Sequence, residues 1–212
     1  MKKVILAVCM MFLSAVISHA DSLYVGGTYS NIASIVNGVA TSEGGGSIDT
    51  SFLNGNKLDY LYCVDLFNNV YVNSTYAFTT VNQTGNIHGN TINNAGEVAY
   101  LLGQYGTGGQ ADQAKALQAA IWHVVNAPGV YDLDTAHAGS AVTTLYNTML
   151  TDGAGKTGVI SNFLWINPGA DAQGTQIYQG VVTSNPVPEP ATLLLFGTGV
   201  AGLAAVVRRK KS

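Results

Sequence analysis

The stretch from Ala111 to Val125 reads ADQAKALQAAIWHVV, and the spacing of its apolar residues predicts an amphipathic helix. The positions that form its apolar stripe are Ala114, Leu117, Ile121, Val124 and Val125. Asn126 and Pro128 follow and are expected to end the helix, because proline disfavours helical geometry in the residue before it. At about 100° per residue, Gln118 falls at the edge of the stripe and one turn before Trp122. A polar amide is thereby placed beside the predicted core.

Strand-like segments flank the helical region. They are short runs rich in valine, isoleucine, tyrosine and threonine, which favour strands. The expected strands are 23–25, 32–36, 58–66, 70–80, 130–133, 160–166 and 175–183. Within 58–66 the residues alternate, so that Tyr62 and Cys63 are expected on opposite faces of a strand. The glycine-rich segment 41–47 is expected to be a loop.

Two further helices are expected beside the central one. Asn94 and Glu97 have the spacing of a capping box, and apolar residues follow at helical spacing as far as Tyr105. The glycine-rich segment 106–109 ends that helix, and another helix is expected over 142–150. The fold class is therefore α+β, with a mainly antiparallel β core and a helical insertion.

Residues 1–20 have the layout of a secretory signal peptide. Two lysines precede an apolar run from Val4 to Ile17, and small residues at Ser18 and Ala20 predict cleavage after Ala20. The run is short for a membrane span, which favours a cleaved signal over an N-terminal anchor. Cys9 lies within the run and is expected to leave with the signal.

The C-terminal segment, residues 186–212, has three parts in a fixed order. The motif Pro188-Glu189-Pro190 comes first, and an apolar run over 191–207 follows, just long enough for a single transmembrane helix. The segment ends in a basic cluster that should remain cytoplasmic by the positive-inside rule. That cluster consists of Arg208, Arg209, Lys210 and Lys211.

This order resembles the PEP-CTERM sorting tail of Gram-negative bacteria. The resemblance implies an exosortase, a membrane cysteine protease that cuts near the Pro-Glu-Pro motif, together with the export machinery, as partners. It also implies a destination at the cell surface or in the extracellular matrix, with transient anchoring in the inner membrane through the C-terminal helix. A plain tail anchor is the alternative interpretation.

The segment between the two signals, residues 21–185, is long enough for one domain with a hydrophobic core. Of the chain's 12 acidic residues only Glu189 lies outside it, whereas it contains only three lysines. An acidic domain lacks the basic surface that nucleic acid requires, so no nucleic-acid partner is expected. Its single cysteine, Cys63, excludes an internal disulfide.

Two short motifs in this segment carry a second resemblance. Tyr62-Cys63-Val64-Asp65 comes first, and Leu117-Gln118-Ala119-Ala120-Ile121-Trp122 follows somewhat over fifty residues later. They resemble the two signatures of bacterial surface thioester domains, namely an aromatic residue or leucine before cysteine and then a Gln-x-Ala-aliphatic-Trp helix. Leu117 departs from that pattern, because the family often has threonine before the glutamine.

The resemblance implies an internal thioester between Cys63 and Gln118. The cysteine thiolate would attack the carboxamide carbon, ammonia would leave, and an amine on a surface or matrix molecule would later replace the sulfur. Such a protein is a covalent adhesin that is used once, not an enzyme. Water must be kept from the bond, and Tyr62 and Trp122 are the expected shields. Asp65 and His123 are possible proton-transfer groups.

Two alternatives from other classes stay open. One is a non-covalent structural protein of the extracellular matrix or biofilm, in which Cys63 is a small buried hydrophobic residue. The other is a cysteine hydrolase, which would require a histidine paired with Cys63. His88, His123 and His137 form no metal-ligand pattern, so neither a metal nor another cofactor is expected.

Overall fold

The computed structural model describes residues 21–27, 29–107, 110–169 and 177–185. The signal peptide expected over 1–20 and the tail expected over 186–212, with its helix over 191–207, lie outside these ranges. No helix in the described part of the chain is both long and apolar enough to cross a membrane. Within the described ranges the architecture is mainly antiparallel β with three α-helices, as the α+β expectation requires.

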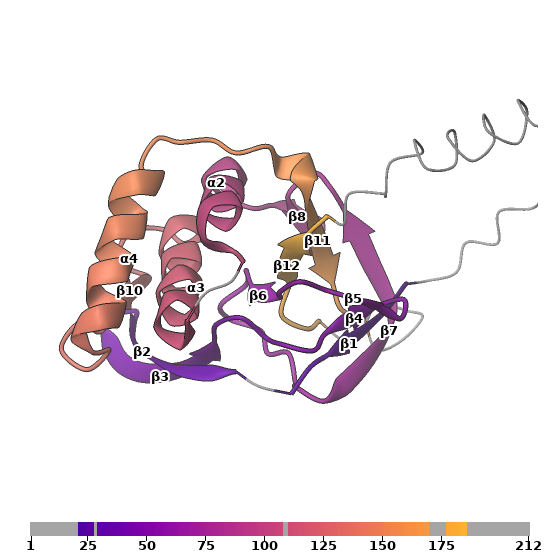
Figure 1. The fold of residues 1–212 in the computed structure, drawn as a ribbon, viewed down its shortest axis with the longest axis horizontal. Coiled ribbons are helices and arrows are strands. Elements are labelled where there is room, and N and C mark those ends of the chain that lie inside the picture. Colours follow the sequence, from indigo (N-terminus) through magenta and orange to yellow (C-terminus); the bar gives the residue numbers. More distant parts are fainter. Residues whose placement is uncertain (1–20, 28, 108–109, 170–176, 186–212) are drawn as a thin grey trace, which may run out of the picture.

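The larger sheet has seven antiparallel strands in the order β5-β4-β1-β7-β11-β12-β6 (Figure 1). Their bounds are β1 Asp21–Val25, β4 Phe52–Leu53, β5 Asn56–Lys57, β6 Tyr62–Cys63, β7 Ser74–Asn82, β11 Phe163–Asn167 and β12 Val181–Ser184. Strand β6 stands last in this order and pairs with β12, where Cys63 is opposite Val181. One edge of β6 therefore has no neighbouring strand among the described residues, and its buried N–H and C=O groups need other hydrogen-bond partners.

Two smaller sheets complete the β structure. The three-stranded sheet has the order β10-β2-β3, with β2 at Ser30–Val36, β3 at Val39–Gly45 and β10 at Tyr131–Leu133. The β2–β3 hairpin turns at Asn37 and Gly38, which both have positive φ, as a tight hairpin of this type requires. The two-stranded sheet pairs β8 (Asn86–Ile87) with β9 (Asn90–Thr91).

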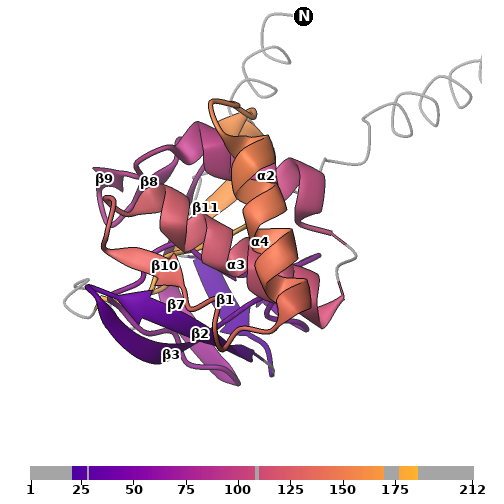
Figure 2. The ribbon, with the colours of Figure 1, turned by 90° about the vertical axis from the view of Figure 1, so that its left-hand side faces the viewer.

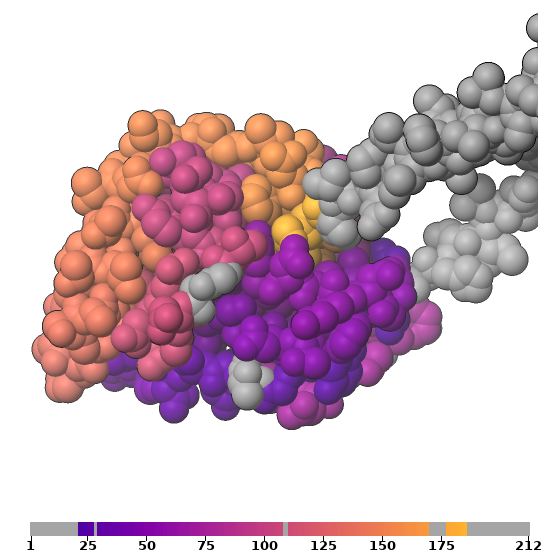
Figure 3. Space-filling model, viewed as in Figure 1, coloured from indigo at the N-terminus to yellow at the C-terminus, as the bar shows by residue number. Residues whose placement is uncertain are grey.

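The helices gather on one side of the molecule (Figures 1 and 2). They are α2 at Ala95–Tyr105, α3 at Ala111–Val125 and α4 at Ser140–Gly153, and a 3₁₀ turn at Ile160–Asn162 leads into β11. Helix α3 lies in the centre, because it contacts both other helices as well as β2, β6 and β10. In Figure 3 the early strands and the helices occupy different parts of the visible face.

The central position of α3 explains its composition. Its sequence bounds agree with those predicted, but its burial extends well beyond the predicted stripe. Ala116, Ala119 and Ala120 are fully buried. Because their side chains are small, neighbouring elements can approach the helix closely on several sides. Gln118, expected at the edge of the stripe, is completely inaccessible to solvent. Trp122 packs edge-on against Tyr131 of β10, with ring centroids 5.4 Å apart.

Several local predictions are wrong. Residues 41–45 of the expected loop 41–47 are strand instead, because β3 continues as far as Gly45 and pairs with β2 throughout, so that only Gly46 and Ser47 lie outside the strand. The alternating strand over 58–66 is reduced to Tyr62–Cys63, and burial on both sides of the chain removes the expected division into two faces. Asn94 makes no capping bond, because its side-chain amide instead donates to Val124 O at 2.8 Å. The strand expected over 70–80 is displaced to β7, Ser74–Asn82.

Gly45 at the end of β3 packs against α3 so closely that a side chain does not fit. A Cβ there would lie 2.7 Å from Gln118 Cγ and 2.8 Å from the Trp122 ring. We expect Gly45→Ala to lower the free energy of unfolding by about 1–3 kcal/mol through overpacking, measured by urea denaturation. Gly44→Ala is the matched control, because its Cβ would meet only the ring of the exposed Tyr29, which can move. Equal losses in the two variants would contradict the close approach at Gly45.

Candidate functional site: the contact between Cys63 and Gln118

Strand β6 and helix α3 bring Cys63 and Gln118 into direct contact. The main-chain N–H of Cys63 donates to Gln118 Oε1 at 2.9 Å, and Gln118 Nε2 donates to the main-chain oxygen of Cys63 at 2.7 Å. Both residues are buried, with exposed fractions of 1% and 0%. The two motifs, 55 residues apart in the chain, thus meet inside the protein.

The Gln118 carboxamide occupies the place of a missing neighbouring strand. Because β6 is last in the sheet, the N–H and C=O of Cys63 on its free edge need partners, and the amide supplies both. We call these two hydrogen bonds the clamp. The clamp stabilises the fold whether or not any reaction occurs, because a buried polar group without a partner costs about 1–3 kcal/mol.

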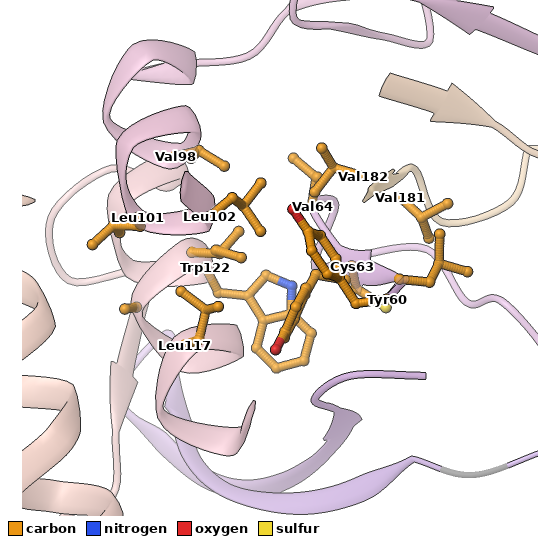
Figure 4. Close-up of a cluster of buried hydrophobic side chains, with 14 of the residues drawn as sticks. Tyr60, Cys63, Val64, Val98, Leu101, Leu102, Leu117, Trp122, Val181 and Val182 are labelled. Carbon is orange, nitrogen blue, oxygen red and sulfur yellow. The ribbon is translucent and has the colours of Figure 1, made fainter. Parts of the chain in front are cut away.

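The same clamp places the carboxamide carbon beside the residue that carries the thiol. Sγ is joined to Cα through Cβ, so rotation about the single Cα–Cβ bond decides where the sulfur lies relative to Gln118. The N–H of Cys63 already donates to the carboxamide oxygen, which is where negative charge would develop during attack at that carbon. Figure 4 shows Cys63 and Trp122 within the same cluster of buried side chains.

Burial makes the free thiol of Cys63 a weak nucleophile. Desolvation, with a further contribution from the negative charge of Asp65, raises the pKa of Cys63 to about 12. At neutral pH the thiol is therefore protonated, whereas acylation of the sulfur requires the thiolate. Any reaction with Gln118 depends on transient loss of this proton.

The two expected proton-transfer groups lie in other networks. The Asp65 carboxylate accepts from the main-chain N–H of Phe67 at 2.9 Å and raises rather than lowers the pKa of Cys63. The His123 ring, on α3, contacts the Tyr146 hydroxyl at 2.9 Å and the Asp132 carboxylate at 3.0 Å. In the part of the chain that the structure describes, no histidine forms a hydrogen bond with Cys63.

The two expected shielding residues line different cavities. Trp122 and Cys63 line a cavity of about 370 Å³, called the Cys63 cavity below, that also borders β3 and the chain after β6. Tyr62 lines a separate cavity of about 360 Å³ together with Tyr60, Asp49 and Asp59. Trp122 thus shares the cavity beside the sulfur-bearing residue, whereas Tyr62 borders another one.

Two further residues close to the contact between Cys63 and Gln118 were not identified from the sequence. Gly45 allows β3 to approach Gln118 and Trp122, and a glycine at the end of a strand is the available signal for such a close approach. Gln179 is buried, lines the Cys63 cavity, and donates its side-chain amide to the main-chain oxygen of Asp65. Nothing in its local sequence indicated this position.

No group of three or more potential metal ligands is present among the described residues. His88 approaches Asp65 at 3.8 Å and His137 bonds Asp134 at 2.7 Å, which are separate pairs. The described side chains therefore provide no recognisable metal centre.

The PEP-CTERM protein-sorting motif matches residues 186–210. This match confirms the sorting tail that Pro188, Glu189, Pro190 and the basic cluster predicted, and it indicates export, sorting to the cell surface and processing by exosortase machinery. The match covers the end of the chain only. No curated protein and no solved structure matches the chain.

Proposed function

We propose that this exported protein forms a thioester between Cys63 and Gln118 and uses it once to bond covalently to an amine on a surface or matrix molecule. The observation that supports the proposal is the pair of hydrogen bonds that holds the Gln118 carboxamide against Cys63. The two motifs that resemble thioester signatures meet in a buried site, and intramolecular acylation requires such proximity.

The reaction has two balanced steps. In the first, the Cys63 sulfur bonds to the Gln118 carboxamide carbon, and the amide nitrogen leaves as ammonia with the thiol proton. In the second, a primary amine attacks the same carbon, the carbon–sulfur bond breaks, and one amine proton passes to sulfur. The products are a substituted amide at Gln118 and the free thiol of Cys63. Because the thioester is not regenerated, each molecule captures one partner.

A non-covalent matrix protein is the second candidate, and a specific observation favours it. Both hydrogen-bonding ends of Gln118 are already satisfied by the main chain of Cys63, so edge capping alone accounts for its burial. The raised pKa of the thiol agrees with an inert core cysteine. The two candidates share the exported, surface-sorted setting that the tail indicates.

Peptide mass mapping distinguishes the two candidates. Trypsin cleaves after Lys57, Lys115 and Lys156, so Cys63 and Gln118 fall into the separate peptides 58–115 and 116–156. We expect the purified protein to yield these peptides as one species, lighter by one ammonia than their sum. Treatment with methylamine should separate them and leave a methylamide on Gln118. Two unmodified peptides before treatment would overturn the covalent proposal and leave the matrix role.

A further inference from the structure

Among the described residues, the lining of the Cys63 cavity contains one carboxylate and no cationic side chain. The carboxylate belongs to Glu43 of β3, and its Oε1 accepts from the Thr41 hydroxyl at 3.0 Å. Within the described ranges Glu43 forms no ion pair. The Asp65 charge also reaches this site, because it contributes to the raised pKa of Cys63. The potential in the cavity therefore favours cations over neutral or anionic molecules.

Aromatic side chains stand at the outer part of the same cavity. Tyr29 and Tyr71 are lining residues that remain 55% and 61% exposed. Tyrosine rings attract alkylammonium groups through their faces, and the attraction grows as the cation loses water. Exposed aromatic rings beside an unpaired carboxylate make a surface suited to an organic cation.

The inner wall of the cavity contains the indole N–H of Trp122. Trp122 lines the cavity and is 1% exposed, yet its Nε1–H has no hydrogen-bond partner in the part of the chain that the structure describes. A buried indole N–H is normally paired, so a bound molecule or the acyl oxygen is expected to complete this site. Figure 4 shows the indole nitrogen on the side of the ring that faces Cys63.

We propose that the Cys63 cavity binds the incoming amine and selects primary amines that carry a second positive charge, as in diamines or a lysine beside another cation. The covalent step rests on the proposed function, whereas the selection rests on the cavity. The protonated end lies beside Glu43, and the neutral amine at the other end attacks the Gln118 acyl carbon. The new carbon–nitrogen bond replaces the carbon–sulfur bond, and the displaced sulfur takes the amine proton.

Three amines that each contain five carbons in an unbranched chain test the selection. Cadaverine has a cationic far end, pentylamine a neutral one and 5-aminopentanoate an anionic one. We expect wild-type protein to couple cadaverine about three to ten times faster than pentylamine and 5-aminopentanoate slowest, measured by mass spectrometry at one pH. Glu43→Gln should remove most of the difference in coupling rate between the three amines. Glu97→Gln, the same chemical change outside the cavity, should preserve it.

A second measurement separates this inference from the proposed function. Cys63→Ala cannot form the thioester, so any effect of cadaverine on its Trp122 indole N–H resonance reports non-covalent binding. A shift that disappears in Cys63→Ala/Glu43→Gln supports the cation site, even if no ammonia is lost from the wild-type protein. Equal coupling rates for the three amines, or no shift with cadaverine, would overturn the inference while leaving a thioester demonstrated by peptide mapping in place.

Discussion

Replacing Cys63 by alanine is expected to reduce methylamine incorporation at Gln118 from one per molecule to background. The reason is chemical: without sulfur no acyl bond forms, and an unactivated carboxamide does not exchange its nitrogen with amines. Mass spectrometry of peptide 116–156 after methylamine treatment measures the result. Label on Gln118 in the Cys63→Ala variant would rule out the sulfur as the activating group.

Cys63→Ala should remove the sulfur without removing the hydrogen bonds between residue 63 and Gln118. Both hydrogen bonds from Gln118 use main-chain atoms of Cys63, which alanine keeps. The clamp should therefore survive while the chemistry is lost. Untreated wild-type protein is the reference for the fold, because Cys63→Ala differs from it only in the sulfur and in the cross-link that the sulfur forms. A circular dichroism spectrum that differs between the two would show that the sulfur or its cross-link supports the fold.

The sequence predicted the contact between the two motifs but not its geometry. Helical periodicity placed α3 over the correct residues, because its apolar positions recur at the spacing of a core-facing helix. The contact between Cys63 and Gln118 was predicted from the resemblance to thioester domains, because no local sequence pattern links residues 55 positions apart. The use of Gln118 to cap the edge of β6 could not be predicted, because strand order is a long-range property.

The errors have a common physical origin in tertiary packing. Gly44 and Gly45 indicated a loop, yet both belong to β3 and pair with β2, and at Gly45 the close approach of α3 leaves no room for a side chain. Asn94 had the sequence context of a capping residue, but its side chain instead satisfies Val124 O on the neighbouring helix. In both places a contact with a distant element overrides a local preference. The Cys63 cavity also joins segments far apart in sequence, so Glu43 could not be assigned to it beforehand.

Replacing Gln118 by alanine is expected to lower the free energy of unfolding by about 3–5 kcal/mol, even when no thioester can form. Alanine leaves the buried N–H and C=O of Cys63 without partners and opens a void beside Gly45. The comparison should be made in the Cys63→Ala background, where neither protein has a cross-link. Urea denaturation of Cys63→Ala and Cys63→Ala/Gln118→Ala then measures the clamp alone.

Gln113 provides the matched control on the same helix. It is half-buried and its side chain donates a single hydrogen bond to Tyr105 O at 3.0 Å, so Gln113→Ala should cost only about 0.5–1.5 kcal/mol. Similar costs at the two positions would show that Gln118 does not clamp β6. A large cost at Gln118 together with ammonia loss would mean that the clamp also positions the carboxamide for acylation. The same cost without ammonia loss would mean that Gln118 has a structural role only, which is to supply hydrogen-bond partners to the edge of β6.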